Sequence, residues 1–193
     1  MNILVMLFIM VDEGSKSTKI LAMLITEDTS TIKTPHIKIF FNLIDSFSQN
    51  TGKNVPQIVN IEKLRFYKQE SFGKAWADFL DDNNLQPLTT GFRRKQLHDG
   101  VHVITGYGSD LIGEAELQAF LLGAKFRLIN LLVGMGALRI IRKRLPNQTK
   151  AARERMWKAY RRGQGCNFNP DTWEPELLWD LPLNEVKEKF GLK

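Results

Sequence analysis

Two of the three histidines in this 193-residue chain, His98 and His102, lie four residues apart. Residues with this spacing share one face of a helix, about 5–6 Å apart, so the two imidazoles could chelate one metal ion. Asp99 follows the first histidine directly, and Glu114 comes after a further eleven residues beyond the second. The spacing therefore predicts a metal site with His98, Asp99, His102 and Glu114 as its ligands.

Glu114 can reach the imidazoles only if the chain turns back after His102. The intervening segment Thr105-Gly106-Tyr107-Gly108-Ser109-Asp110 carries two glycines that permit positive φ, and its last two residues can cap a following helix. We therefore predict a helical hairpin, with the histidines on a helix over 92–104 and Glu114 at the start of the next helix. Asp99 is expected either as a further ligand or as a partner that orients an imidazole.

Two imidazoles with one or two carboxylates suit a divalent ion and leave coordination positions open for water or a ligand. Open positions favour chemistry over a purely structural role, and His98 and Asp99 are the candidate catalytic residues. One divalent metal is predicted: the imidazoles favour zinc, iron or manganese, and oxygen from a bound phosphate would admit magnesium. Taken singly, each residue could equally be an ordinary hydrogen-bonded or helix-terminal side chain.

The composition is that of a chain able to bury one sizeable core. Hydrophobic residues make up 43% of it, and no linker, internal repeat or low-complexity tract divides it. We expect a single domain over residues 1–193. Residues 1–11 are interpreted as an apolar N-terminal extension, because this run lacks a signal-peptide pattern and is too short to span a bilayer. The single cysteine, Cys166, excludes an intrachain disulfide and fits a reducing compartment.

Apolar residues recur at helical spacing along most of the chain, which predicts an all-α fold of about six or seven helices. The expected helices cover residues 18–26, 37–48, 70–82, 92–104, 114–141, 150–162 and 183–190. The stretch 55–59 is ambiguous, and 167–182 is expected to be irregular. Within the longest helix, Gly134 and Gly136 would weaken the helix unless they allow close packing. Its uncharged run, 128–138, is too short to cross a membrane and is expected to form a core, a groove wall or an interfacial face.

The formal net charge of +6 is concentrated in one segment. Between Arg139 and Arg162 there are ten basic residues and one acidic residue. Such a segment favours an anionic partner, although a solvated helix face is an equally ordinary explanation. We expect no nucleic acid partner, because no zinc-finger spacing, RNP-type motif or recognition helix accompanies the charges. The candidate contacts to a phospholipid headgroup or a ligand phosphate are Arg139, Arg142, Lys143 and Arg144.

With these residues placed, the chain resembles the ubiquinone (coenzyme Q) biosynthesis protein family of the fourth COQ protein. The signature that carries the resemblance is His98-Asp99-x-x-His102-x11-Glu114. Matching residues flank it over about 71–193: Gly73, Phe79-Leu80, Arg93, Gly106, Gly113, Trp179-Asp180-Leu181-Pro182-Leu183-Asn184-Glu185-Val186 and Phe190-Gly191-Leu192. The turn Tyr107-Gly108-Ser109 departs from the Met-Pro-Thr-like sequence common in that family.

The resemblance implies an all-helical, lipid-associated protein that binds a divalent metal, usually taken as zinc, through the His-Asp-His-Glu set. It implies a role in ubiquinone assembly: binding a prenylated quinone precursor or a prenyl phosphate, supporting oxidative decarboxylation of the ring, and organising other quinone-biosynthesis proteins. It also implies an apolar cavity for the isoprenoid tail, since each buried CH2 contributes about 0.8 kcal/mol. The candidate wall residues lie after Glu114: Phe120, Leu121, Leu128, Leu131, Leu132 and Met135.

Other interpretations of the same motif stay open. The chain could be a non-catalytic lipid-binding scaffold for a quinone-biosynthesis complex, with a structural metal. It could be a phosphohydrolase of the His-Asp type, for which His36 would have to supply an earlier histidine, or a metallopeptidase with Asp99 as the general base. We expect a homodimer, since a helical lipid binder exposes apolar surface, and a cytoplasmic location or a peripheral one on the inner face of a membrane.

Overall fold

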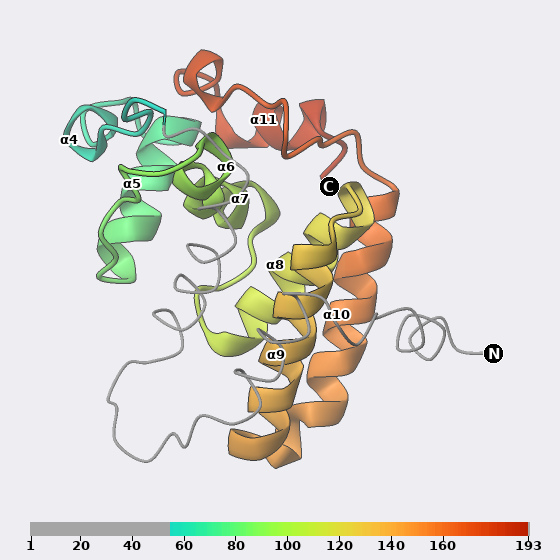
Figure 1. Ribbon diagram of the computed structural model, residues 1–193. Helices are drawn as coiled ribbons and strands as arrows, with labels where there is room; N and C mark the ends of the chain where they lie inside the picture. The colour runs from blue at the N-terminus through green and yellow to red at the C-terminus, as the bar shows by residue number, and fades with distance from the viewer. Residues whose placement is uncertain (1–54, 193) are drawn as a thin grey trace. The chain divides into compact units, whose positions relative to one another are not determined.

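The computed structural model describes residues 55–192, all of which belong to one compact unit, Ile44–Lys193. The regular structure of these residues consists of eight α-helices and two short 3₁₀ helices, without a β-strand (Figure 1). This confirms the all-α prediction. The helices expected over 18–26 and 37–48, the extension 1–11 and His36 lie outside the described residues, and a single domain over 1–193 stays a prediction.

Three helices, α8 (Leu111–Ala124), α9 (Leu128–Arg144) and α10 (Thr149–Gln164), pack against one another side by side (Figure 1). Residues 125–127 join α8 to α9, and the 3₁₀ helix η1 (Pro146–Gln148) leads from α9 to α10. Such short connections make successive helices antiparallel. α8 is buried along most of its length, because α9 and α10 both pack against it.

The prediction of one helix over 114–141 is wrong, because the chain breaks between α8 and α9. Lys125 and Arg127 have extended backbone, with φ values of −151° and −142°. The turn lets α9 fold back and cover an apolar face of α8 that a continuous helix would leave in water. Neither glycine nor proline occurs between Ala124 and Leu128, so the sequence offers no local sign of this break.

The remaining helices form the part of the structure that carries the histidines. They are α4 (Ile61–Leu64), α5 (Phe72–Asp82), α6 (Arg93–Gln96), α7 (His98–Thr105) and α11 (Leu183–Lys189), with the 3₁₀ helix η2 (Pro175–Leu177) before α11. The helix expected over 92–104 is thus divided into α6 and α7 at Leu97. The helices predicted over 70–82, 150–162 and 183–190 are confirmed, with ends within two residues of those expected.

Aromatic side chains join the two groups of helices. Trp76 of α5 stacks on Trp173 with 5° between the ring planes, and Trp173 contacts Phe168 at a centroid distance of 5.1 Å. Phe168 in turn contacts Phe120 of α8 at 6.0 Å. The segment 167–182, irregular as expected, is therefore held in place by aromatic packing rather than by backbone hydrogen bonding alone.

Two glycines allow the backbones of α8 and α10 to touch. A Cβ atom on Gly123 would lie 2.2 Å from the Tyr160 carbonyl oxygen, and one on Gly163 would lie 2.2 Å from the Phe120 carbonyl oxygen. The close packing that the sequence suggests at Gly134 is absent, because a Cβ there would meet its nearest neighbour at an ordinary 3.5 Å. The tight crossing is thus between α8 and α10, not along α9.

This difference predicts opposite effects for the same substitution at two helical glycines. Gly163→Ala should lower the free energy of unfolding by about 1–3 kcal/mol, because the added methyl group forces the α8 and α10 backbones apart. Gly134→Ala should raise it by about 0.5–1 kcal/mol, because alanine is the better helix former and the space is open. Urea denaturation followed by circular dichroism measures both, and equal effects would contradict the packing described.

Candidate metal centre

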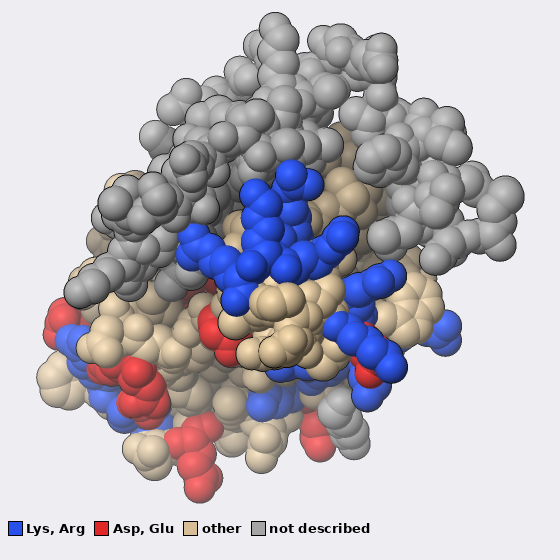
Figure 2. Space-filling model, turned by 90° about the horizontal axis from the view of Figure 1, so that it is seen from below, with Lys and Arg blue, Asp and Glu red and all other residues tan. Residues whose placement is uncertain are grey.

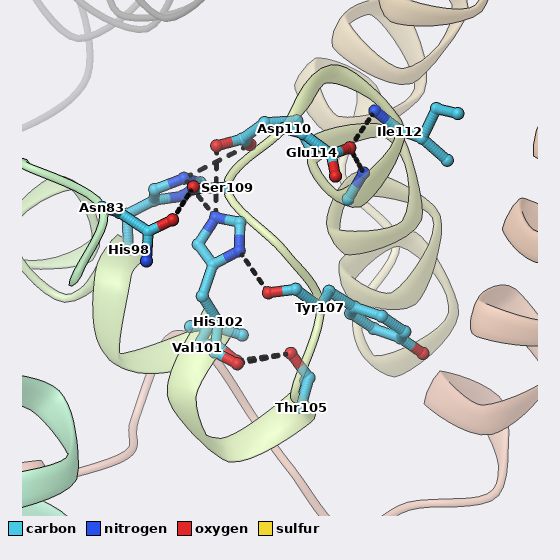
Figure 3. Close-up of polar contacts among 11 residues, drawn as sticks. Asn83, His98, Val101, His102, Thr105, Tyr107, Ser109, Asp110, Ile112 and Glu114 are labelled. Carbon is cyan, nitrogen blue, oxygen red and sulfur yellow. Dashed lines mark hydrogen bonds and ion pairs between the residues drawn. The ribbon is translucent and has the colours of Figure 1, made fainter. Parts of the chain in front are cut away.

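The two histidines lie where the sequence predicts, one turn apart on α7. His98 is the first residue of the helix and His102 the fifth, and both side chains are buried. Their Nε2 atoms are 3.2 Å apart, and the ring planes are almost perpendicular, at 79°. Both imidazoles therefore present a nitrogen lone pair or an N–H group to the same small volume (Figure 3).

The predicted hairpin returns the chain to the histidines. Gly106 ends α7 with a φ of 76°, a conformation that favours glycine. Asp110 then caps α8, because its Oδ1 accepts hydrogen bonds from the backbone N–H groups of Ile112 and Gly113 at 2.8 and 2.9 Å. A Cβ atom on Gly113 would lie 2.0 Å from the Gly108 carbonyl oxygen, so the loop can pack this closely only against glycine.

Glu114 completes a three-residue cluster from the first turn of α8. Its Oε1 lies 3.2 Å from Nε2 of His102, and its Oε2 lies 3.5 Å from Nε2 of His98. Figure 3 shows the three side chains pointing toward one another from α7 and α8. Ligand atoms around a tetrahedral zinc ion are separated by about 3.3 Å, given metal–ligand bonds of about 2.0–2.1 Å.

Two further observations show that these residues fit a divalent cation. Oε2 of Glu114 is buried and forms no hydrogen bond with the described residues, so it is left with an acceptor site to fill. Nδ1 of His102 lies 3.1 Å from the Tyr107 carbonyl oxygen. Because a carbonyl can only accept, Nδ1 must carry the proton, and Nε2 is left with its lone pair for a metal ion.

Electrostatics favour a charged Glu114 in the folded chain. Burial alone would raise the pKa of Glu114, but the neighbouring His98 and the hydrogen bond with His102 outweigh it and lower the pKa to about 2. Burial would likewise lower the pKa of His102, yet its hydrogen bond with Glu114 and the charge there raise it. In the absence of a metal ion, the carboxylate therefore attracts a proton to the imidazole opposite it.

Asp99, the fourth predicted ligand, is buried on α7 but is not among the three residues whose ligand atoms converge. It lies close enough to His98, His102 and Glu114 to interact with their charges. Burial raises the pKa of Asp99, and the nearby His98 and His102 offset this rise only in part. The structure thus brings together three of the four predicted residues and leaves Asp99 beside them.

Three neighbours of the cluster were not singled out as site residues from the sequence. Phe79 of α5 stacks on the His102 ring at a centroid distance of 5.4 Å. Tyr107 supplies the carbonyl that orients His102. Arg162 of α10 donates hydrogen bonds to the Thr105 carbonyl at the end of α7 and to the Leu192 carbonyl, and its guanidinium lies over the Tyr107 ring. Phe79 was marked by the family resemblance and Tyr107 by its place in the predicted turn, whereas Arg162 was counted only as part of the basic segment.

A cavity of about 420 Å³ adjoins the cluster, because His98 also lines it. Of the six residues predicted to form a lipid-binding wall, Leu121 and Leu128 line this cavity. The other four do not line it: Phe120, Leu131, Leu132 and Met135. Phe120 instead belongs to the buried core, where it contacts Tyr107 and Phe168.

The four predicted headgroup contacts lie toward the far end of α9, and all of them are exposed. Figure 2 shows Lys and Arg side chains gathered on one face of the molecule. The exposed basic residues toward the end of α9 and at the start of α10 are Arg139, Arg142, Lys143, Arg144, Lys150 and Arg153. Among the residues that the structure describes, no helix combines the length and apolar character needed to cross a membrane.

Comparison with known proteins agrees with this arrangement. The model of the family named Coenzyme Q (ubiquinone) biosynthesis protein Coq4 matches residues 53–193. The chain belongs to this family. The resemblance stated from the signature is thereby confirmed, and membership supports a role in coenzyme Q biosynthesis.

The fold also has a counterpart among solved structures. The crystal structure of a proposed ubiquinone biosynthesis protein from Nostoc punctiforme superposes with a TM-score of 0.61 at 20% sequence identity. The match covers 94% of this chain and 84% of the other. At this identity the likeness establishes the fold alone. No curated protein matches the chain.

The lowered pKa of Glu114 predicts an acid-sensitive contribution to stability. A carboxyl group whose pKa falls from 4.5 to about 2 on folding stabilises the native state above pH 4.5, and this contribution disappears as the pH falls toward 2. In metal-free protein, Glu114→Gln should therefore lower the free energy of unfolding at pH 6, by on the order of 2 kcal/mol, and much less at pH 3. Urea titrations in the presence of a chelator measure this, and an equal loss at both pH values would contradict it.

Arg162 should act on the cluster without touching it. Arg162→Lys cannot hold both the Thr105 and Leu192 carbonyls in the fork geometry of a guanidinium, so the segment that carries Tyr107 should loosen. We expect zinc affinity to fall by about tenfold, because partners that orient a ligating histidine have effects of this size. Titration against a competing chelator measures the affinity. The exposed neighbour variant Arg161→Lys should bind as the parent does, and an equal loss there would remove this role.

Proposed function

We propose that this chain is a metal-dependent protein of coenzyme Q biosynthesis that binds a prenylated quinone precursor or a prenyl phosphate and supports oxidative decarboxylation of the ring. The observation that carries the proposal is the convergence of His98, His102 and Glu114 next to a cavity that His98 also lines. Family membership supports the pathway, and the donor set supports the metal.

Two imidazoles and one carboxylate form a donor set that occurs both in catalytic zinc sites and in iron sites with open coordination positions. A divalent ion held by His98, His102 and Glu114 would supply Lewis-acid polarisation of a ring carboxylate or phenol oxygen, with redox chemistry added in the case of iron or manganese. Zinc remains the metal that we expect first, followed by iron, manganese and magnesium. Mass spectrometry of the purified protein would identify it.

The reaction replaces the ring carboxylate with a hydroxyl group and releases carbon dioxide. It is a two-electron oxidation of the ring carbon, so it requires an external oxidant of the dioxygen class. The chain's own residues would hold and shield the reacting group. Glu114 and the Tyr107 carbonyl fix the orientation of His102. The buried carboxyl of Asp99, whose pKa is raised by burial, could give or take a proton beside the ring.

A second candidate function, a lipid-binding scaffold with a structural metal, is favoured by the position of the cluster. The three residues connect the start of α8 to α7, so an ion there could hold the hairpin together. The peptidase alternative is weaker, because Asp99 has a shorter side chain than the glutamate that serves as general base in His-Glu-x-x-His zinc sites. The phosphohydrolase alternative depends on His36, outside the described residues.

Association with a membrane surface and with other quinone-biosynthesis proteins is part of the same proposal. The exposed basic residues at the end of α9 are suited to anionic headgroups or a ligand phosphate. A homodimer stays a prediction, and the exposed side chains of Phe126 and Trp157 offer apolar surface for one. Lipid retained by the purified protein, identified by mass spectrometry, would test the proposed ligand class.

Removing one ligand should separate the catalytic from the scaffold function. In Glu114→Gln, we expect metal content to fall and turnover of a prenylated hydroxybenzoate to drop by more than about 100-fold. Loss of a direct metal ligand should thus cost more than loss of a residue that only orients a ligand. Circular dichroism should still report a folded chain. The control Glu185→Gln, an exposed position on α11, should retain metal and turnover. If the metal-free protein unfolds, or if the parent protein turns nothing over, the scaffold function is favoured instead.

A further inference from the structure

The cavity beside His98 has an excess of positive charge. Two basic residues of its wall, Arg94 and Arg127, both contact the same acidic wall residue, Asp171. Asp171 is shared, because one of its carboxylate oxygens accepts a hydrogen bond from Arg94 and the other accepts one from Arg127. A single carboxylate between two guanidinium groups leaves one positive charge without a matching negative charge.

Arg94 is the more deeply placed of the two guanidinium groups. Its side chain exposes 23% of its surface, compared with 52% for Arg127. Burial lowers the pKa of Arg94, and the nearby Asp171 offsets this only in part. A guanidinium nevertheless stays charged in proteins. A second anion bound in the cavity beside Arg94 would therefore be stabilised.

Asn130 adds a hydrogen-bond donor that has no acceptor. Its Oδ1 accepts a hydrogen bond from Arg94 at 3.3 Å. A guanidinium can only donate, so the amide must turn its oxygen toward Arg94 and its Nδ2 elsewhere. Only 4% of Asn130 is exposed, and Nδ2 forms no hydrogen bond with any residue that the structure describes. Buried amide N–H groups nearly always have partners, and Asn130 lines the cavity, so a ligand bound there could supply the acceptor.

Apart from Lys95 and Gln118, the rest of the wall is apolar and partly aromatic. Phe92 and Trp173 line the cavity together with the aliphatic side chains Val101, Leu121 and Val133. Its volume, about 420 Å³, falls in the range of small-molecule sites. Apolar walls around a small number of polar groups are typical of a site for a flat, mainly apolar molecule with one charged end.

We propose that this cavity binds the carboxylate of a small aromatic acid, with Arg94 and Nδ2 of Asn130 as the donors that hold the oxyanion. A planar carboxylate matches the donor fork of arginine, and Arg127 supplies a second positive charge. The choice of an aromatic acid rests on the proposed function, in which a ring carboxylate is the reacting group. The affinity for an anion rests on the cavity alone. Arg94 and Asn130 would then be the residues that select a ring carrying a carboxylate.

The test uses the full chain and three simple probes, without added metal. Isothermal titration with 4-hydroxybenzoate should show binding, phenol should bind at least about tenfold more weakly because it lacks the carboxylate, and inorganic phosphate should not compete. Asn130→Asp keeps the size of the side chain but places a negative charge where the donor was. We expect it to weaken 4-hydroxybenzoate binding by at least about tenfold.

A matched control makes the same substitution at an exposed asparagine. Asn147→Asp in η1 adds the same negative charge away from the cavity and should leave 4-hydroxybenzoate binding unchanged. Unaltered binding in Asn130→Asp would overturn the proposal, and so would equal binding of phenol. If phosphate instead binds more tightly than 4-hydroxybenzoate and Asn130→Asp abolishes that binding, the proposal of a carboxylate site is overturned and a phosphate site is indicated. Because these titrations need no metal, their failure is distinguishable from a failure of Glu114→Gln to lose metal.

Discussion

A carboxylate buried between two imidazoles is the interaction on which this site depends. Glu114 exposes only 13% of its side chain, and a buried carboxylate is strongly destabilising unless a positive charge balances it. A proton on His102 or a divalent ion can supply that charge. The lowered pKa of Glu114 and the raised pKa of His102 show that the folded chain already concentrates charge in this volume. An arriving ion therefore finds its ligands oriented and has mainly to displace a proton.

The orientation of these ligands is set largely by a helix that contributes none of them. α10 lies against α8 closely enough for backbone contact at Gly123 and Gly163. From this position Arg162 reaches the carbonyl of Thr105, the last residue of α7, and covers the Tyr107 ring. α10, which the sequence indicates only as part of a basic surface segment, therefore has a second role. One face carries positive charge, and the other fixes the turn between α7 and α8.

The sequence predicted the three-residue cluster correctly, because its members and the turn between them lie close together in the chain. The spacing of His98, His102 and Glu114 and the glycines of the turn predicted a hairpin that brings the three together, because each step depends on a few adjacent residues. The break after Ala124 could not be predicted in this way. It depends on covering the apolar surface of α8, which is a tertiary requirement without a glycine or proline to mark it. The role of Asn130 was equally invisible, since an unpaired amide is defined only by what surrounds it.

The metal centre and the cavity share His98. Glu114 and Asp99 lie near this residue, whereas Arg94 and Arg127 line the cavity on which it borders. Without a metal ion, a proton on His102 balances the charge of Glu114, so the centre offers no net attraction to an anion in the cavity. With a divalent ion at the centre, the same anion would face positive charge from both directions. If both proposals hold, metal and aromatic acid should therefore strengthen each other's binding, since linkage between two sites is reciprocal.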